Sequence, residues 1–380
     1  MENQKKDEKK KKKGLFYVLT HRENGKKSGV LILALFFTIV MAGTATYAWF
    51  TANYTVSVTK LDVTVASGAG IQISTDAITW KSMINSTELL SASATYPAAV
   101  NQVPTQTNSG SALSPVSTVK TVNDITGTTA AGTQSLKGLT MYLGNVTSNV
   151  DGDYILTTTE QTDTNGKTGH YLAFDVFIKS DFSQSVPLYL TKATSVHGYT
   201  ELGGTDKDIE YASRIAIIEE GNIASSATTA QMQGLNTGAS VKFIEPNYEV
   251  HTATGVTHAR DVYGITTTTT ASDAIPYSGV KAEIAASDAS AYPKGVKWGD
   301  ATATKYSSLF EDVTVDFKIA STNDTSDTGT RTELMSLAPG VTKLRLYMWI
   351  EGQDIDCENN ASGGSILFNI GFEVDEPVAS

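Results

Sequence analysis

The sequence predicts a mainly β protein, with an N-terminal transmembrane helix followed by an antiparallel, jelly-roll-like β-sandwich that carries long loop-rich insertions. Three observations support this fold class. Apolar and polar residues alternate in many short runs, and a period of two is typical of half-buried strands. Thr, Ser, Ala and Gly are abundant, which favours strands and turns. One long uncharged apolar stretch precedes all of these runs.

The charges divide the chain into three parts. Residues 1–28 carry ten Lys or Arg residues against four acids, residues 29–50 carry no charge, and residues 51–380 hold the other 19 bases and 36 acids. An apolar span of about 20 residues is long enough to cross a bilayer, and its basic flank stays in the cytoplasm. We therefore expect a basic cytoplasmic head at 1–28, a single-pass anchor at 29–50 and an extracellular β-rich domain at 51–380.

Two other readings of the apolar segment stay open. The small residues around Tyr47 allow signal-peptide cleavage near Ala48, which would release the body as a secreted protein. A prepilin-type leader would place a basic pair and a glycine before the apolar run, as at 26–29, but the early glutamate of a type IV pilin helix is absent. Residues 51–380 are exported under all three interpretations.

The stretch Gly43–Thr51, GTATYAWFT, resembles the leader end of the camelysin and TasA family of Gram-positive surface proteins. It differs by an inserted Ala45 and by Thr51-Ala52-Asn53 in place of Ser-Asp. The resemblance covers about nine residues. It implies export, a jelly-roll β-sandwich and, in some members, matrix fibres built by donation of an N-terminal strand.

The first predicted strand, Tyr54–Val65, directly follows the apolar segment. Its apolar residues occupy even positions up to 58 and odd positions from 61, so a β-bulge is expected between them. Ile71–Ser74 and Ile78–Lys81 are expected to form a hairpin. The other predicted strands are Leu139–Val146, Tyr154–Thr159, Tyr171–Lys179, Val186–Lys192, Arg214–Glu219, Val313–Ile319, Leu344–Ile350 and Ser365–Val374. The best helical signal is Thr332–Leu337, and Asp151–Asp153 is typical of a hairpin turn.

Two stretches lack this alternation. Residues 85–135 and 220–305 are rich in small polar residues, which is typical of loops. They are either long surface loops, or residues 195–305 form an inserted subdomain. The predicted core comes from 51–84, 136–195 and 308–374.

Known catalytic motifs are missing from the sequence. It contains no nucleotide-binding loop, no His-Glu-x-x-His and no Gly-x-Ser-x-Gly. The single cysteine, Cys357, excludes an intrachain disulfide and a cysteine-based zinc site, and the five histidines are expected to be solvated. The acidity of the body argues against binding nucleic acid. We expect no enzymatic activity.

One acidic segment is a candidate metal site. Asp354, Asp356 and Glu358 alternate between the two clearest strands, and three carboxylates suit a hard cation such as Ca²⁺. The spacing differs from an EF-hand, and a solvated acidic turn is the simpler interpretation.

The sequence thus predicts a membrane-anchored or exported cell-surface structural protein, serving adhesion or forming a matrix filament. Tyr54–Val65 is the strand expected to pair between copies, because an unpaired edge can template another chain. The alternative is an exported carbohydrate- or ligand-binding module or an enzyme on the same sandwich.

Overall fold

The computed structural model describes residues 56–66, 70–104, 113–148, 154–200, 206–261, 275–287, 296, 298–321, 333–358, 361 and 363–375. The predicted head at 1–28, the anchor at 29–50, the cleavage position near Ala48 and the turn at Asp151–Asp153 lie outside these residues. Contacts divide the chain into two units, Met1–Thr46 and Tyr47–Ser380, and every described residue belongs to the second. Among the described residues, no helix has both the length and the apolar character needed to span a bilayer.

The fold is mainly β, as predicted, and two six-stranded sheets share its largest core. Sheet I contains, in spatial order, β17 (Glu333–Leu337), β10 (Val186–Leu190), β19 (Ser365–Val374), β1 (Ser57–Val65) and β3 (Met83–Asn85), with β11 (Ser195–Gly198) also paired to β19. Sheet II contains β16 (Phe317–Ile319), β13 (Val241–Pro246), β12 (Ser213–Ile223), β18 (Gly340–Ile350), β9 (Leu172–Ser180) and β2 (Ile71–Ser74).

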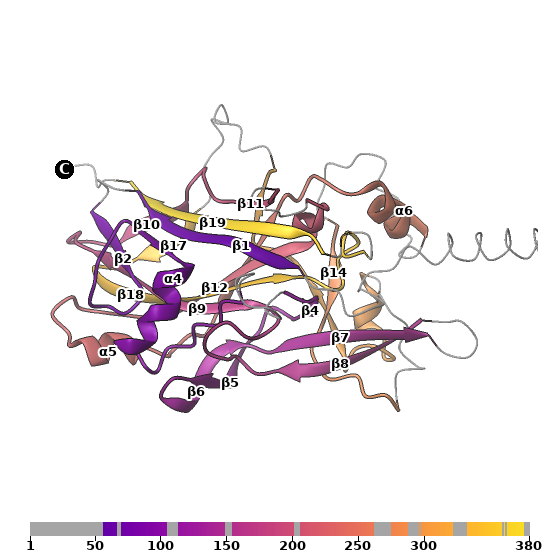
Figure 1. The fold of residues 1–380 in the computed structure, drawn as a ribbon, viewed down its shortest axis with the longest axis horizontal. Coiled ribbons are helices and arrows are strands. Elements are labelled where there is room, and N and C mark those ends of the chain that lie inside the picture. Colours follow the sequence, from indigo (N-terminus) through magenta and orange to yellow (C-terminus); the bar gives the residue numbers. More distant parts are fainter. Residues whose placement is uncertain are drawn as a thin grey trace, which may run out of the picture. The chain divides into compact units, whose positions relative to one another are not determined.

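The prediction of an antiparallel sandwich is wrong at two strand pairs. β1 runs parallel to β19 along its whole length, from Ser57 opposite Ser365 to Val65 opposite Phe372, and Figure 1 shows the two strands side by side. β13 and β16 are also parallel. Period-two alternation indicates which face of a strand is buried, but it contains no information on the direction of the neighbouring strand.

Alternation did locate the buried faces of β1 and β19. The register of β1 shifts between Val58 and Lys60, which confirms the predicted bulge. The apolar side chains on both sides of the bulge are buried in the sandwich core, as are those of β19 at positions 366, 368, 370, 372 and 374. Burial on one face with a bulge-corrected register is the pattern that the sequence predicted.

A further layer covers the second face of sheet II. It consists of β4 (Val116–Ser117), β5 (Val122–Thr129), β6 (Gly132–Leu139), β7 (Met141–Ser148), β8 (Tyr154–Gln161), β14 (Tyr277–Val280) and β15 (Phe310–Val313). Side chains of these strands pack against Tyr347 and Trp349 of β18 in a second core. Sheet II is therefore covered on both faces, and every residue of β18 is buried.

The stretches predicted as loops contain regular structure. Residues 85–135 include helix α4 (Ser86–Ser91), the 3-10 helix η1 (Ala92–Ala94), β5 and the start of β6, which pairs with β5 in a hairpin. Residues 220–305 include α5 (Thr229–Gln233), β13, α6 (Ala253–Asp261), β14 and η6 (Asp300–Thr302). β12 and β13, inside the range 195–305, belong to sheet II. The β5–β6 hairpin has few apolar residues, so its sequence lacks the alternation that indicates a strand.

Three local predictions need correction. Thr332–Leu337 was predicted as a helix, but β17 occupies Glu333–Leu337 and pairs with β10, burying Leu334 and Leu337. The predicted strand Ile78–Lys81 is a bend that meets β2 only at the Ile73–Lys81 bridge. The predicted strand Val313–Ile319 is divided between β15 and β16. In the first case strand pairing overrides a weak helical preference.

Candidate functional site

The predicted acidic segment follows β18 and is buried, which corrects the expectation of a solvated turn. Asp354, Asp356 and Glu358 are at most 5% exposed. Asp354 Oδ2 accepts a hydrogen bond from Arg214 Nη2 at 2.5 Å, and the backbone N–H of Asp356 donates to Asp354 Oδ1 at 2.8 Å. Since Arg214 is itself fully buried on β12, the Asp354 carboxylate is neutralised by a fixed guanidinium.

The other two acids of the segment turn toward the start of α6. Asp356 Oδ2 lies 2.7 Å from His251 Nδ1, and Asp356 Oδ1 accepts from the backbone N–H of Thr252 at 2.8 Å. Glu358 Oε1 accepts from the Thr252 hydroxyl at 2.6 Å. His251 was expected to be solvated, yet its side chain is 5% exposed, because α6 folds over the acidic segment.

These three carboxylates do not converge on one point. Asp354 faces Arg214, while Asp356 and Glu358 share Thr252. Among the described residues, the acidic side chains that bring three carboxylate oxygens within 4.8 Å of one another are Asp206, Asp208 and Glu210 instead. The proposal that Asp354, Asp356 and Glu358 bind Ca²⁺ therefore stays a prediction.

Burial leaves this region rich in protonatable carboxyls. Glu245 forms a 3.0 Å ion pair with Arg214, and Glu351 accepts hydrogen bonds from Trp349 Nε1 and the backbone N–H of Gln353. Burial raises the pKa of Glu245, Glu351 and Glu358 to about 7 each, against the opposing effect of their donors. Near neutral pH these carboxyls are therefore partly protonated. Their hydrogen bonds and ion pairs hold the 351–358 segment in place, and they leave no open binding site there.

A second buried charge network lies farther along β18. The Asp175 carboxylate of β9 accepts hydrogen bonds from Arg345 Nε at 2.8 Å, from Arg345 Nη2 at 3.1 Å and from the Tyr96 hydroxyl at 3.0 Å. Lys343 Nζ lies 3.3 Å from the same carboxylate. These charges sit between sheet II and the covering layer and are at most 2% exposed. The sequence does not reveal this network, because Lys343 and Arg345 alternate with apolar residues as on a solvent-facing strand face.

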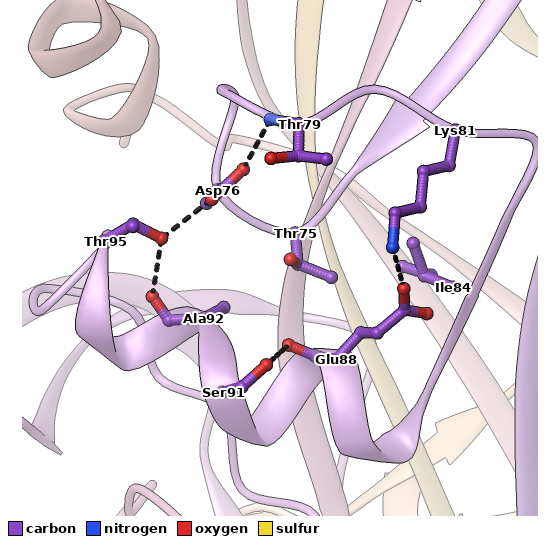
Figure 2. A pocket seen from close by; sticks show the side chains of 9 residues that line it. All are labelled: Thr75, Asp76, Thr79, Lys81, Ile84, Glu88, Ser91, Ala92 and Thr95. Atoms are coloured by element: carbon purple, nitrogen blue, oxygen red, sulfur yellow. Dashed lines mark hydrogen bonds and ion pairs between the residues drawn. The ribbon is translucent and has the colours of Figure 1, made fainter.

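A shallow pocket lies between the β2 turn and α4, and Figure 2 shows its lining. It encloses about 240 Å³. Asp76 accepts hydrogen bonds from the backbone N–H groups of Ile78 and Thr79 and from the Thr95 hydroxyl. Burial raises the pKa of Asp76, but these donors outweigh burial and bring the pKa below its ordinary value.

The remaining charges of the pocket are also used by the fold. Lys81 forms an ion pair with Glu88, and Glu88 closes a capping box with Asn85 at the start of α4. The volume is below the range of about 300–1,000 Å³ that is typical of small-molecule sites. The pocket therefore stabilises a turn and a helix end and offers no convergent set of free polar groups.

Of the strand expected to pair between copies, Tyr54–Val65, the structure describes residues 56–65, and β1 occupies Ser57–Val65. Within this chain it is not an unpaired edge. β19 flanks it along its length, while β3 pairs only with Asp62–Thr64 on the other side. Cys357 is fully buried in the sandwich core.

Comparison of the chain with protein-family models, with curated proteins and with solved structures finds no match.

Proposed function

We propose that the chain is a cell-surface structural protein, exported through its apolar segment at 29–50, and that it assembles by exchanging β1 between copies. The N-terminus stays in the cytoplasm and the β-rich body lies outside the cell, either anchored or released by cleavage near Ala48. The role is structural rather than catalytic, and the acidic body has no nucleic-acid partner.

The observation that supports this proposal most is the position of β1. It follows the apolar segment at 29–50 in the sequence, and its main partner in sheet I, β19, is distant in the chain. An identical groove exists in every copy. A strand that fits between β19 and β3 of its own chain fits the same groove of a neighbour with the same contacts.

The burial of apolar side chains favours β1 in a groove in both arrangements, in its own chain or exchanged into a neighbouring copy. β1 buries Val58, Leu61, Val63 and Val65, and the preceding Val56 is also buried. Such side chains contribute about 1.5–3 kcal/mol each, so together they contribute roughly 10 kcal/mol before the entropy of ordering the strand is subtracted. An empty groove is therefore strongly unfavourable, and a displaced β1 requires a β1 from another copy in its place.

The link after β1 suits an exchange hinge. Residues 66–70, which connect sheet I to sheet II, read Ala-Ser-Gly-Ala-Gly, and Gly70 has a φ of +69° against the ring of Phe182. Small residues and glycine allow the backbone to change direction at low steric cost.

Cysteine cross-linking distinguishes the two arrangements. Asp62 and Asn369 are register partners on β1 and β19, and both are partly exposed. In a Cys357→Ala background, Asp62→Cys with Asn369→Cys should form disulfides. Exchange of β1 produces a ladder of covalent oligomers on non-reducing gels of the surface assembly, and the ladder collapses on reduction.

The controls are the two single cysteine variants, which should give dimers at most. Disulfides confined to single chains in assembled material would refute strand exchange. So would polymers of normal length after deletion of 54–65. The pocket at Asp76 is the feature that would serve the alternative, an exported carbohydrate- or ligand-binding module or enzyme, but its small volume favours the structural role.

A further inference from the structure

We infer that Asp206, Asp208 and Glu210 form a calcium site at the entrance to the 3-10 helix η3 (Ile209–Ala212), where the chain passes from sheet I to sheet II. Each residue contributes a carboxylate oxygen, and these oxygens lie within 4.8 Å of one another. The three residues alternate along Asp-Lys-Asp-Ile-Glu, and the left-handed backbone of Asp208, with a φ of +62°, directs the turn.

Glu210 is the residue that points to a cation. It is 94% buried, and its Oε2 has no hydrogen-bond partner within the part of the chain that the structure describes. A buried carboxylate oxygen without a donor is costly, and two further carboxylates nearby add repulsion. A bound cation removes all of these costs together.

The ligand chemistry selects Ca²⁺. All three side chains offer hard oxygen ligands, and nitrogen or sulfur ligands that would favour zinc are absent from this cluster. Asp206 and Asp208 are exposed, so water completes the six to eight oxygen ligands that calcium takes, whereas Mg²⁺ requires a stricter octahedron.

The surroundings leave the carboxylates little freedom. Asp206 packs against Gly198 at the end of β11, where an added Cβ would lie 2.3 Å from Asp206 Oδ1. The carbonyl of Glu210 accepts hydrogen bonds from Ser213 and Asn247, which hold η3 in place. Calcium would thus tie the end of β11 to η3, beside the start of β19, since Gly198 pairs with Ile366.

The test uses the full 380-residue chain, stripped of metal and purified in detergent. Calorimetry and thermal unfolding with CaCl₂ should show a dissociation constant in the range of about 10⁻⁴–10⁻³ M, as in extracellular modules, and a rise in Tm. Asp206→Asn and Asp208→Asn should each weaken calcium binding about tenfold or more, because each removes a charged ligand.

Glu210→Gln provides a readout that loss of folding would not imitate. Its Tm should no longer respond to calcium, yet without calcium the variant should melt at or above the wild-type temperature, because a neutral amide replaces an unpaired buried carboxylate. Asp124→Asn, an exposed acid on β5, is the matched control and should leave calcium binding unchanged.

Terbium locates the ion independently. Tyr211 directly follows Glu210 in η3, so its phenol is close enough to sensitise a lanthanide bound at the cluster. Tyr211→Phe should reduce the phenol-sensitised emission of Tb³⁺ at saturating metal.

Two results would overturn the inference. One is no change of Tm and no sensitised emission at millimolar metal. The other is a calcium response that persists in Asp206→Asn, Asp208→Asn and Glu210→Gln. A response that persists in these variants but disappears in Asp356→Asn would place the ion at the 354–358 segment instead. Neither result depends on assembly through β1, so the two proposals fail separately.

Discussion

Replacing Asp175 with asparagine tests how the buried charges on β18 are held. The Asp175 carboxylate accepts hydrogen bonds from Arg345 Nε at 2.8 Å and Nη2 at 3.1 Å, and Lys343 Nζ lies 3.3 Å from it. Asp175→Asn keeps the shape of the side chain but removes its charge. Arg345 and Lys343 then lose the carboxylate that forms ion pairs with both of them among the described residues.

The expected loss is large. Removing one partner of a buried ion pair costs about 3–5 kcal/mol, because the remaining charge stays desolvated and uncompensated. The side chains involved are at most 2% exposed, so water cannot replace the carboxylate without opening the covering layer. In a domain of this size we expect Tm to fall by roughly 5–10 °C.

Double variants separate the two cations. Lysine can lose its proton when buried, and burial already lowers the pKa of Lys343, whereas arginine stays protonated. Adding Arg345→Met to Asp175→Asn should therefore recover more stability than adding Lys343→Met.

Urea unfolding monitored by tryptophan fluorescence measures these differences. A loss below about 1 kcal/mol for Asp175→Asn would refute the reasoning, because it would place this pair among exposed ion pairs. Greater recovery with Lys343→Met would refute the assignment of Arg345 as the principal unpaired charge.

Three further predictions concern the core and its turns. Burial raises the pKa of Glu351 and Glu358 to about 7. The folded state therefore binds more protons than the unfolded state between about pH 4.5 and 7. As a result, the free energy of unfolding falls as pH rises through that window. Thermal melts should thus show a higher Tm near pH 5 than near pH 8, with a smaller difference in Glu351→Gln; an unchanged slope in that variant would contradict the assignment. Gly340→Ala should destabilise more than Gly132→Ala, because both have a φ near +110° but only Gly340 would place a Cβ against a backbone carbonyl, at 2.3 Å. Equal losses by urea unfolding would remove the steric explanation. The Cys357 thiol is fully buried and should react with a thiol reagent only as fast as the protein unfolds, so rapid labelling of the native chain would be inconsistent with its position.

Parts of the fold could be predicted because they depend on local pattern. The bounds of β19 and the bulge in β1 follow from the positions of apolar side chains, which must face the core. The β5–β6 hairpin could not be predicted in this way, because its glycines and threonines pair through the backbone and carry little apolar signal.

The candidate site was predicted only in its position along the chain. The sequence identifies Asp354, Asp356 and Glu358 as a distinctive acidic segment, but Arg214 and His251, which pair with it, are more than 100 residues away. The Asp206–Glu210 alternation is readable in the sequence, yet the burial of Glu210 that distinguishes it from an ordinary acidic turn depends on the packing of η3.

The sequence by itself determined that the body is built from strands and which side chains of β1 and β19 face a core, because period-two alternation reports the burial of one face. Only the tertiary structure decided that sheet II is covered on both faces and that β1 runs parallel to β19. Lys343 and Arg345 alternate with apolar residues as a solvent-exposed face would, but distant strands cover them and Asp175 neutralises them. Strand neighbours and covering layers are contacts between residues far apart in the chain, so no local pattern contains them.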